Sequence, residues 1–182
     1  MIGRRRLAAA ALALVSRGAA AAVPGLPAVT LFDQDGAPRP LAALGRGRPL
    51  MMSFFFSGCT TLCPPQAMAL QALQEELVGR APAVLPLLLS VSLDPLGDTP
   101  EAMRGFAARF DLSLGLQHGW LLLGGKPAQL ARVWAAFEVP DGRPTDHAAL
   151  LWLGAAEGRA WRRVGALTPT TTLADLLLQG PP

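Results

Sequence analysis

The sequence has few charged residues and lacks any apolar run long enough to cross a membrane. Charged residues make up 16% of the 182 residues, whereas hydrophobic residues make up 51%. Disordered chains are rich in charge and poor in apolar side chains, so this composition excludes disorder for most of the chain. No apolar run reaches the roughly 18 residues that span a bilayer, which excludes a multi-span membrane protein. The length predicts one domain with its own core.

The basic charge of the chain is concentrated at its N-terminus. Three consecutive arginines precede a short apolar stretch, and a run of alanines follows. A basic region, a short apolar region and small residues at a cleavage point are the layout of a secretory signal. We therefore predict a signal peptide at 1–22, with an uncleaved membrane anchor as the alternative, and an exported domain at 23–182. Export would place this domain in the periplasm or at the outer face of the inner membrane.

Removal of the predicted signal changes the charge of the chain. It takes away four arginines and leaves 12 basic against 13 acidic residues, so the formal net charge falls from +3 to −1. The remaining arginines are scattered, and no aromatic residues are interleaved with them as they are on nucleic-acid-binding surfaces. We therefore exclude nucleic acid as a partner.

Segments typical of buried strands alternate with segments typical of amphipathic helices. Prolines suited to a first helical turn and the turn signal Asp35-Gly36 mark several boundaries. Strands are expected at 28–32, 50–56, 84–93, 120–123, 147–153 and 161–167, and helices at 64–79, 100–110, 127–137 and 171–178. In the first of these helices, leucines form the apolar face and Gln71, Gln74, Glu75 and Glu76 the solvent face. The alternation, with a hairpin near the end, predicts an α/β three-layer sandwich in which helices flank a mixed central sheet.

The two cysteines of the chain are Cys59 and Cys63, in the loop 57–63 that follows the buried strand at 50–56. Their spacing lets the two sulfur atoms converge on a disulfide or on one metal ion. Cys63 precedes Pro64 at the start of a helix, where unpaired N–H groups favour a thiolate. A bridge across so short a loop constrains the unfolded chain little, so the position favours a redox or metal role over a purely structural disulfide.

The only histidines are His118 and His147, so few nitrogen donors are available to a metal site. His118 fits an ordinary loop, and His147 opens an apolar strand. From the residues alone, each is more simply explained as a structural or solvated side chain than as a ligand. Two cysteines and one histidine would select a soft ion, preferably Cu(I), although Zn(II) and Cu(II) also accept these donors. Met51, Met52 and Met68 fit core positions.

Three motifs, in this order and approximate spacing, resemble the Sco/SenC/PrrC family of thioredoxin-like copper-binding proteins. They are FFFSGCTTLCPPQ at 54–66, VSLDPLGDTPEAMRGFAARF at 91–110 and TDHAALLWLG at 145–154. The resemblance runs from about Pro27 to Leu167 and implies a thioredoxin-like fold. It also implies that Cys59, Cys63 and His147 bind one copper ion. In the middle motif, Asp94 is a candidate to hold the site in place.

The resemblance further implies a role in the assembly of cytochrome c oxidase. The protein would deliver copper to the binuclear copper centre of an oxidase subunit, or reduce the cysteines of that centre. Both roles use reduced thiols that can also form a disulfide, so thiol–disulfide partner proteins are implied as well. One departure is that Thr60-Thr61-Leu62 stands between the cysteines, where many members have a proline and an acidic residue.

Three other functions remain as alternatives. The main one is a thiol–disulfide oxidoreductase that uses only Cys59 and Cys63, although such enzymes usually carry C-x-x-C. A thioredoxin-like peroxidase lacks a recognisable motif around either cysteine. A structural bridge predicts that Cys59→Ser changes stability without changing any activity.

Overall fold

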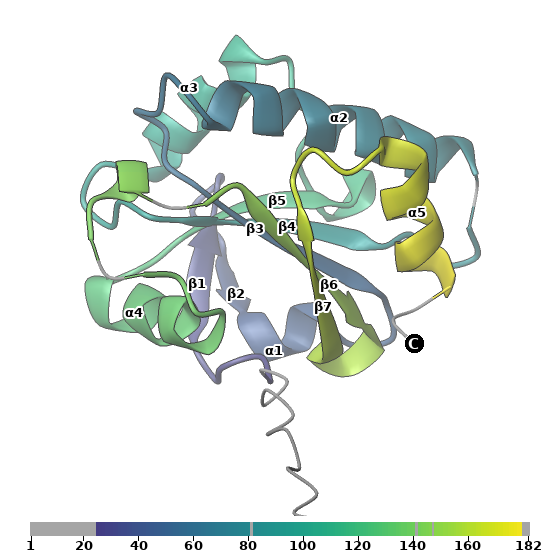
Figure 1. Cartoon of the computed structure of the whole chain (residues 1–182). Helices are drawn as coiled ribbons and strands as arrows, with labels where there is room; N and C mark the ends of the chain where they lie inside the picture. The colour runs from purple at the N-terminus through teal and green to yellow at the C-terminus, as the bar shows by residue number, and fades with distance from the viewer. Residues whose placement is uncertain (1–24, 81, 141, 147, 180–182) are drawn as a thin grey trace, which may run out of the picture.

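Three apolar segments form the centre of a seven-stranded sheet (Figure 1). The computed structural model describes residues 25–80, 82–140, 142–146 and 148–179. Every residue of β3 (Leu50–Phe55), β4 (Leu87–Ser92) and β5 (Trp120–Gly124) is buried. These strands run parallel to one another, and their long apolar runs fit a position covered on both faces.

Antiparallel strands complete the sheet on both sides, in the order β2-β1-β5-β4-β3-β6-β7. On one side, β1 (Thr30–Asp33) pairs with β5 and with β2 (Pro38–Pro40). On the other side, β6 (Leu150–Ala155) pairs with β3 and with β7 (Arg159–Gly165). The predicted mixed sheet is therefore confirmed.

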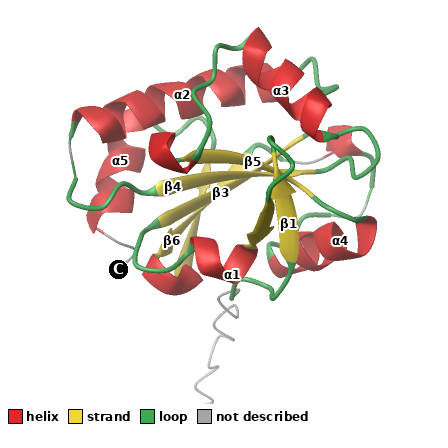
Figure 2. Cartoon of the chain, turned by 180° about the vertical axis from the view of Figure 1, so that it is seen from behind, coloured by secondary structure: helices red, strands yellow, loops and turns green. Residues whose placement is uncertain are grey.

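Helices cover both faces of the sheet (Figure 2). One face carries α2 (Cys63–Gly79), α3 (Pro100–Arg109) and α5 (Thr170–Gln179). The opposite face carries the single-turn α1 (Leu41–Leu44) and α4 (Pro127–Ala136). Short 3-10 turns lie at Leu116–His118, Pro144–Asp146 and Ala156–Gly158. This is the three-layer α/β arrangement that the sequence predicts.

The start of α3 shows how the sequence sets a helix boundary. The Thr99 side chain accepts a hydrogen bond from the Ala102 backbone N–H at 3.2 Å, and Pro100 occupies the first turn. Both are the expected roles for these residue types at a helix N-terminus. The apolar side chains of Met103 and Phe106 then point into the core and fix α3 against the sheet.

Several boundaries and side chains differ from the sequence expectations. The strand expected at 84–93 is β4, which begins only at Leu87, because Pro86 has no N–H to donate to a ladder. Gln74 is buried, although it was expected on the solvent face. Its amide donates to the carbonyls of Ser113 and His118, both at 2.7 Å. Met51 and Met52 are buried, as expected, but the core assignment is wrong for Met68, which is 62% exposed. The burial of Gln74 and the exposure of Met68 depend on tertiary contacts that the local sequence does not reveal.

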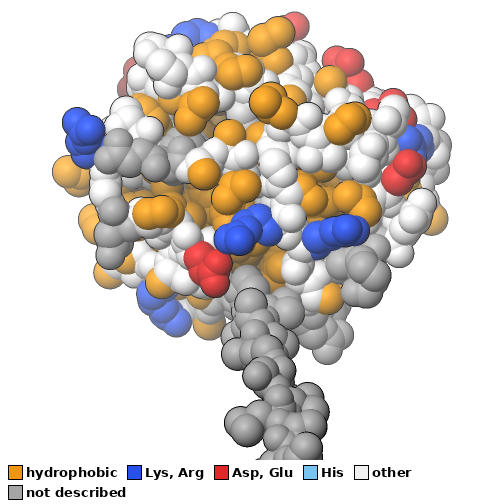
Figure 3. Space-filling model, in the orientation of Figure 1, with side chains coloured by type: hydrophobic (Ala, Val, Ile, Leu, Met, Phe, Trp, Pro, Cys, Tyr) orange, Lys and Arg blue, Asp and Glu red, His pale blue; other side chains and the backbone are white. Residues whose placement is uncertain are grey.

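Charged side chains of the described residues are dispersed over the surface. On the face shown in Figure 3, lysine and arginine side chains lie scattered among apolar and uncharged ones. Ion pairs at the surface include Arg80 with Glu76 and Asp175, and Arg163 with Glu138. Exposed pairs of this kind contribute little to stability, so the fold depends mainly on its two apolar cores.

Candidate functional site

The predicted site lies at the carboxyl end of β3, where the chain turns into α2 (Figure 1). Cys59 lies in the connecting loop, and Cys63 is the first residue of α2. Two prolines follow Cys63 in the first helical turn, where a backbone N–H would have no helical partner. Gln66, also in this turn and 5% exposed, donates from its side-chain amide to the Phe54 carbonyl at 2.9 Å. This bond ties the start of α2 to the end of β3.

The two cysteines are close together, buried and not bonded as a disulfide. The Cys63 backbone N–H donates to the Cys59 sulfur, with an N···S distance of 3.2 Å. The Cys59 N–H donates to the Phe56 carbonyl at 3.1 Å, which closes the turn before it. The loop thus holds two soft sulfur donors next to each other, an arrangement suited to a disulfide or to a thiophilic metal ion.

The surroundings of the two thiols push their acidities apart. Burial by itself raises the pKa of Cys59, but hydrogen bonds from the Cys63 thiol and from the N–H groups of Cys63, Thr61 and Leu62 outweigh it and lower the pKa. Burial, followed by the hydrogen bond to Cys59, raises the pKa of Cys63 to about 12. The expectation that the helix N-terminus favours a thiolate at Cys63 is therefore wrong, because burial and the hydrogen bond to Cys59 raise the pKa of Cys63. Cys59 is the sulfur that carries negative charge first, and Cys63 is the thiol that donates to it.

A buried aspartate contacts the cysteine loop from the segment before α3. Asp98 is 2% exposed. One carboxylate oxygen accepts from the Ser57 backbone N–H at 2.7 Å, and the other accepts from the Ser92 hydroxyl at 2.6 Å. Burial raises the pKa of Asp98 even though these hydrogen bonds oppose the rise. The carboxylate links the first residue after Phe56 to the end of β4.

Asp94, the residue that sequence analysis selected for this role, makes different contacts. One of its carboxylate oxygens accepts from the N–H groups of Leu96 and Gly97, at 3.2 and 2.9 Å, within its own turn. The structure therefore gives the contact with the loop to Asp98 rather than to Asp94. The spacing of the motif gives no signal for this choice, because both aspartates fit a turn before a helix.

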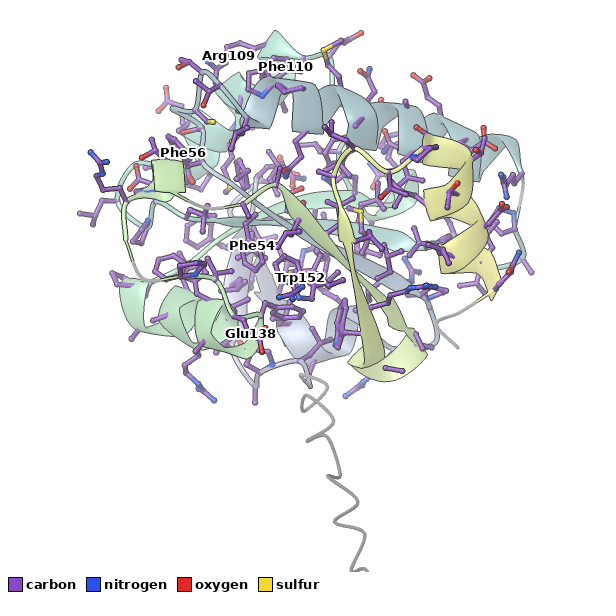
Figure 4. The ribbon with its side chains drawn as sticks, viewed as in Figure 1. Phe54, Phe56, Arg109, Phe110, Glu138 and Trp152 are labelled. Atoms are coloured by element: carbon purple, nitrogen blue, oxygen red, sulfur yellow. The ribbon has the colours of Figure 1, made fainter. Side chains whose placement is uncertain are left out.

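Arg109, at the end of α3, also contacts the cysteine loop and was not identified from sequence. Its guanidinium donates to the Ser57 carbonyl at 2.5 Å. The same group lies over the rings of Phe106 and Phe110, 5.5 and 5.6 Å from their centroids, and Figure 4 shows Arg109 beside Phe110. The aromatic rings flank the guanidinium and orient it.

The predicted third ligand, His147, lies outside the described residues. The flanking elements are the 3-10 turn Pro144–Asp146 and β6, which begins at Leu150. His118 is exposed in its 3-10 turn, where its carbonyl binds Gln74, as expected for a loop residue. The described part of the chain contains no group of three or more His, Cys, Asp or Glu side chains that could hold a metal ion. Its two candidate sulfur donors are Cys59 and Cys63.

The predicted signal peptide at 1–22 also lies outside the described residues. Within the part of the chain that is described, no helix has the length and apolar character needed to cross a bilayer.

Parts of this chain match two curated proteins. The chain is 34% identical over 84 residues to a SCO1 protein homolog from Bacillus subtilis (strain 168), a match over 46% of this chain. This match covers 42% of the length of the Bacillus protein, and the match to a second curated relative, from Stutzerimonas stutzeri, covers 52% of its length. The chain thus matches about half the length of these curated relatives.

Solved structures share the fold at low sequence identity. BsSco, described as a Sco-family cytochrome c oxidase assembly protein with a disulfide switch, gives a TM-score of 0.72 at 23% identity, over 86% of this chain and 92% of that one. Bradyrhizobium japonicum ScoI with copper bound gives 0.69 at 23%, over 87% and 99%. The mixed sheet between helical layers is therefore the thioredoxin-like fold of these proteins. The SCO1/SenC family model matches residues 25–178, and this chain belongs to the SCO1/SenC family.

Proposed function

We propose that this chain binds one copper ion as cargo through Cys59, Cys63 and His147, and that it serves in the assembly of cytochrome c oxidase. The observation that carries the proposal is the pair of free, buried sulfur atoms held together by the Cys63 N–H···S bond of 3.2 Å. Thiolate pairs favour Cu(I), and one imidazole would complete a three-ligand site. ScoI with copper bound shares the fold, which supports the same cargo here.

The proposed role is delivery of copper to the binuclear copper centre of an oxidase subunit. Burial of both cysteines would shield a bound ion from bulk thiols and oxidants, and a docking subunit would reach it through the exposed part of the loop, where Leu62 is 39% exposed. Residues 1–22 would direct export or anchor the chain, and residues 23–182 would act in the periplasm or at the outer face of the inner membrane.

A second candidate function is reduction of a partner's disulfide by the same cysteine pair. The contrast in pKa supports it, because Cys59 would attack as a thiolate and Cys63 would then resolve the mixed disulfide. In that reaction the partner disulfide is reduced to two thiols, and the Cys59–Cys63 pair is oxidised to a disulfide. No metal or histidine takes part.

We expect the reduced protein to bind one Cu(I) per chain and His147→Ala to weaken that binding by at least about tenfold, since an imidazole donor is lost. Competition with a Cu(I) chelator of known affinity measures the effect. His118→Ala is the matched control and should bind as the unmodified protein does. Equal affinity and an unchanged spectrum in His147→Ala would remove His147 from the ligand set.

The same variant separates the two functions. If the chain is a copper carrier, His147→Ala lowers copper transfer to an apo oxidase subunit. If it is a thiol reductase, His147→Ala reduces a disulfide-bonded substrate at the original rate, and only the cysteine variants lose activity.

A further inference from the structure

Two side chains, one from the turn before α3 and one from the last residue of α3, hold the backbone of Ser57. The Asp98 carboxylate accepts from the Ser57 N–H at 2.7 Å, and the Arg109 guanidinium donates to the Ser57 carbonyl at 2.5 Å. Asp98 lies two residues before α3, and Arg109 is its last residue. A single residue between β3 and Cys59 is thus held by two charged groups from one helix and its leading turn.

The Asp98 side of this contact is built into the core. Its second oxygen is used by the Ser92 hydroxyl, and the Ser92 oxygen in turn accepts from the Asp94 N–H at 3.0 Å. Hydrogen bonds to a charged acceptor are stronger than neutral ones, and a buried N–H left without its acceptor is costly. Ser57 is therefore fixed relative to the end of β4.

The Arg109 side is held at the surface. The guanidinium lies over two phenylalanine rings, so its direction toward Ser57 is restricted before the hydrogen bond forms. Because Arg109 is exposed, its removal leaves no buried charge behind. It can be changed with little effect on the core.

The Ser57 contacts bear on the cysteines through a short length of chain. Cys59 is two residues beyond Ser57, and its sulfur depends on the N–H groups of the following loop for its hydrogen bonds. A loop that moved at Ser57 would carry Cys59 away from Cys63. The geometry of the pair therefore depends on where Ser57 is held.

We propose that Asp98 and Arg109 are positioning residues that fix the cysteine loop and so set how tightly the Cys59–Cys63 pair holds copper. The inference rests on the proposed copper function. It also has a consequence without copper, because a fixed loop raises the effective concentration of one thiol at the other. The equilibrium of the pair with glutathione therefore tests the loop even if copper is not the cargo.

The first test compares two substitutions at Asp98. In Asp98→Asn, the amide oxygen can still accept from the Ser57 N–H, and the amide NH2 group can donate to the Ser92 hydroxyl oxygen. Asp98→Ala removes both hydrogen bonds. We expect Asp98→Ala to weaken Cu(I) binding by about 10- to 100-fold and Asp98→Asn to stay within about threefold. Equal losses in both variants would show that charge rather than position matters, which overturns the proposal. Glu101→Ala is the matched control, because Glu101 is an exposed acidic residue in the first turn of α3, and it should leave the affinity unchanged.

The second test uses Arg109→Met, which should fold even if Asp98→Ala does not. We expect about fivefold weaker Cu(I) binding and a fall of similar size in the glutathione equilibrium constant for disulfide formation. Arg104→Met is the control, since Arg104 lies on the same helix but donates to the Gln34 carbonyl at 2.8 Å. A residue needed only for stability would lower the melting temperature and leave both constants unchanged. If Arg109→Met lowers only the melting temperature and leaves both constants unchanged, the proposal is wrong. If the glutathione equilibrium changes but the protein binds no copper, only the proposed copper function is wrong.

Discussion

In the reduced, metal-free protein at pH 7, iodoacetamide is expected to modify Cys59 about thirtyfold or more faster than Cys63. The pKa of Cys59 lies below the ordinary value of 9.0 and that of Cys63 is about 12. The thiolate fraction is then about a thousandfold or more larger at Cys59, and its lower intrinsic nucleophilicity removes only part of this advantage. Fragment masses of the peptide that contains both cysteines report which sulfur carries the label.

The two alkylation rates should also reach their plateaus at different pH values, for the same reason. The rate at Cys59 should level off at a lower pH than for an ordinary thiol, because its pKa is lowered. The rate at Cys63 should keep rising about tenfold per pH unit through pH 10, since its thiolate forms only near pH 12. Similar rates and similar profiles for both cysteines would contradict the hydrogen-bond arrangement of the loop.

A single substitution provides the control. In the unmodified protein, the charge of the Cys59 thiolate and the hydrogen bond to Cys59 both raise the pKa of Cys63. Cys59→Ser removes that charge and weakens that hydrogen bond, so the pKa of Cys63 should fall. Burial, the largest cause, remains. Cys63 should therefore react faster in Cys59→Ser than in the unmodified protein, although still more slowly than Cys59 does.

Phe137→Ala is expected to destabilise the domain by about 3–5 kcal/mol. Phe137 is fully buried at the end of α4, and its ring centroid lies 4.9 Å from that of Trp161, 5.8 Å from Trp152 and 6.1 Å from Phe54. Figure 4 shows Phe54 and Trp152 close together. Their ring centroids are 5.5 Å apart, and the rings are edge-on to each other. Removal of the central ring leaves a cavity among three large side chains.

Urea unfolding measures this loss as a shift of the midpoint. Leu167→Ala is the control, because Leu167 is 87% exposed and its substitution should change the free energy of unfolding by less than about 0.5 kcal/mol. Trp152 lies on β6 opposite Met52 of β3, so loss of the Phe137 ring should also loosen β6. A change below about 1 kcal/mol in Phe137→Ala would mean that the aromatic cluster is not a packed unit.

Much of the fold could be predicted because local signals and burial agree. Long apolar runs marked β3 and β4, and prolines marked the first turns of α2, α3 and α4. The single-turn α1 was missed because four residues carry no helical period. Gln74 was misplaced because its partners lie about forty residues away along the chain, and no local pattern reveals them.

In the candidate site, only the closeness of the two cysteines could be predicted from the sequence. Cys59 and Cys63 stand out because they are the only cysteines, and their spacing alone brings the sulfurs together. Asp98 and Arg109 could not be assigned, because their contacts with Ser57 span 41 and 52 residues. Such contacts depend on how α3 packs on the sheet, which is a property of the whole fold.

The apolar core that contains Cys59 and Cys63 also contains Leu151 and Leu153 of β6, the strand that pairs with β3. As the chain emerges N-terminus first, β3 and the cysteine loop appear well before β6, which begins only at Leu150. Until β6 pairs with β3, this core is incomplete, whereas in the folded domain Cys59 and Cys63 are only 3% and 2% exposed. We therefore expect the two cysteines to be more accessible to oxidants in the incompletely folded chain than in the folded domain.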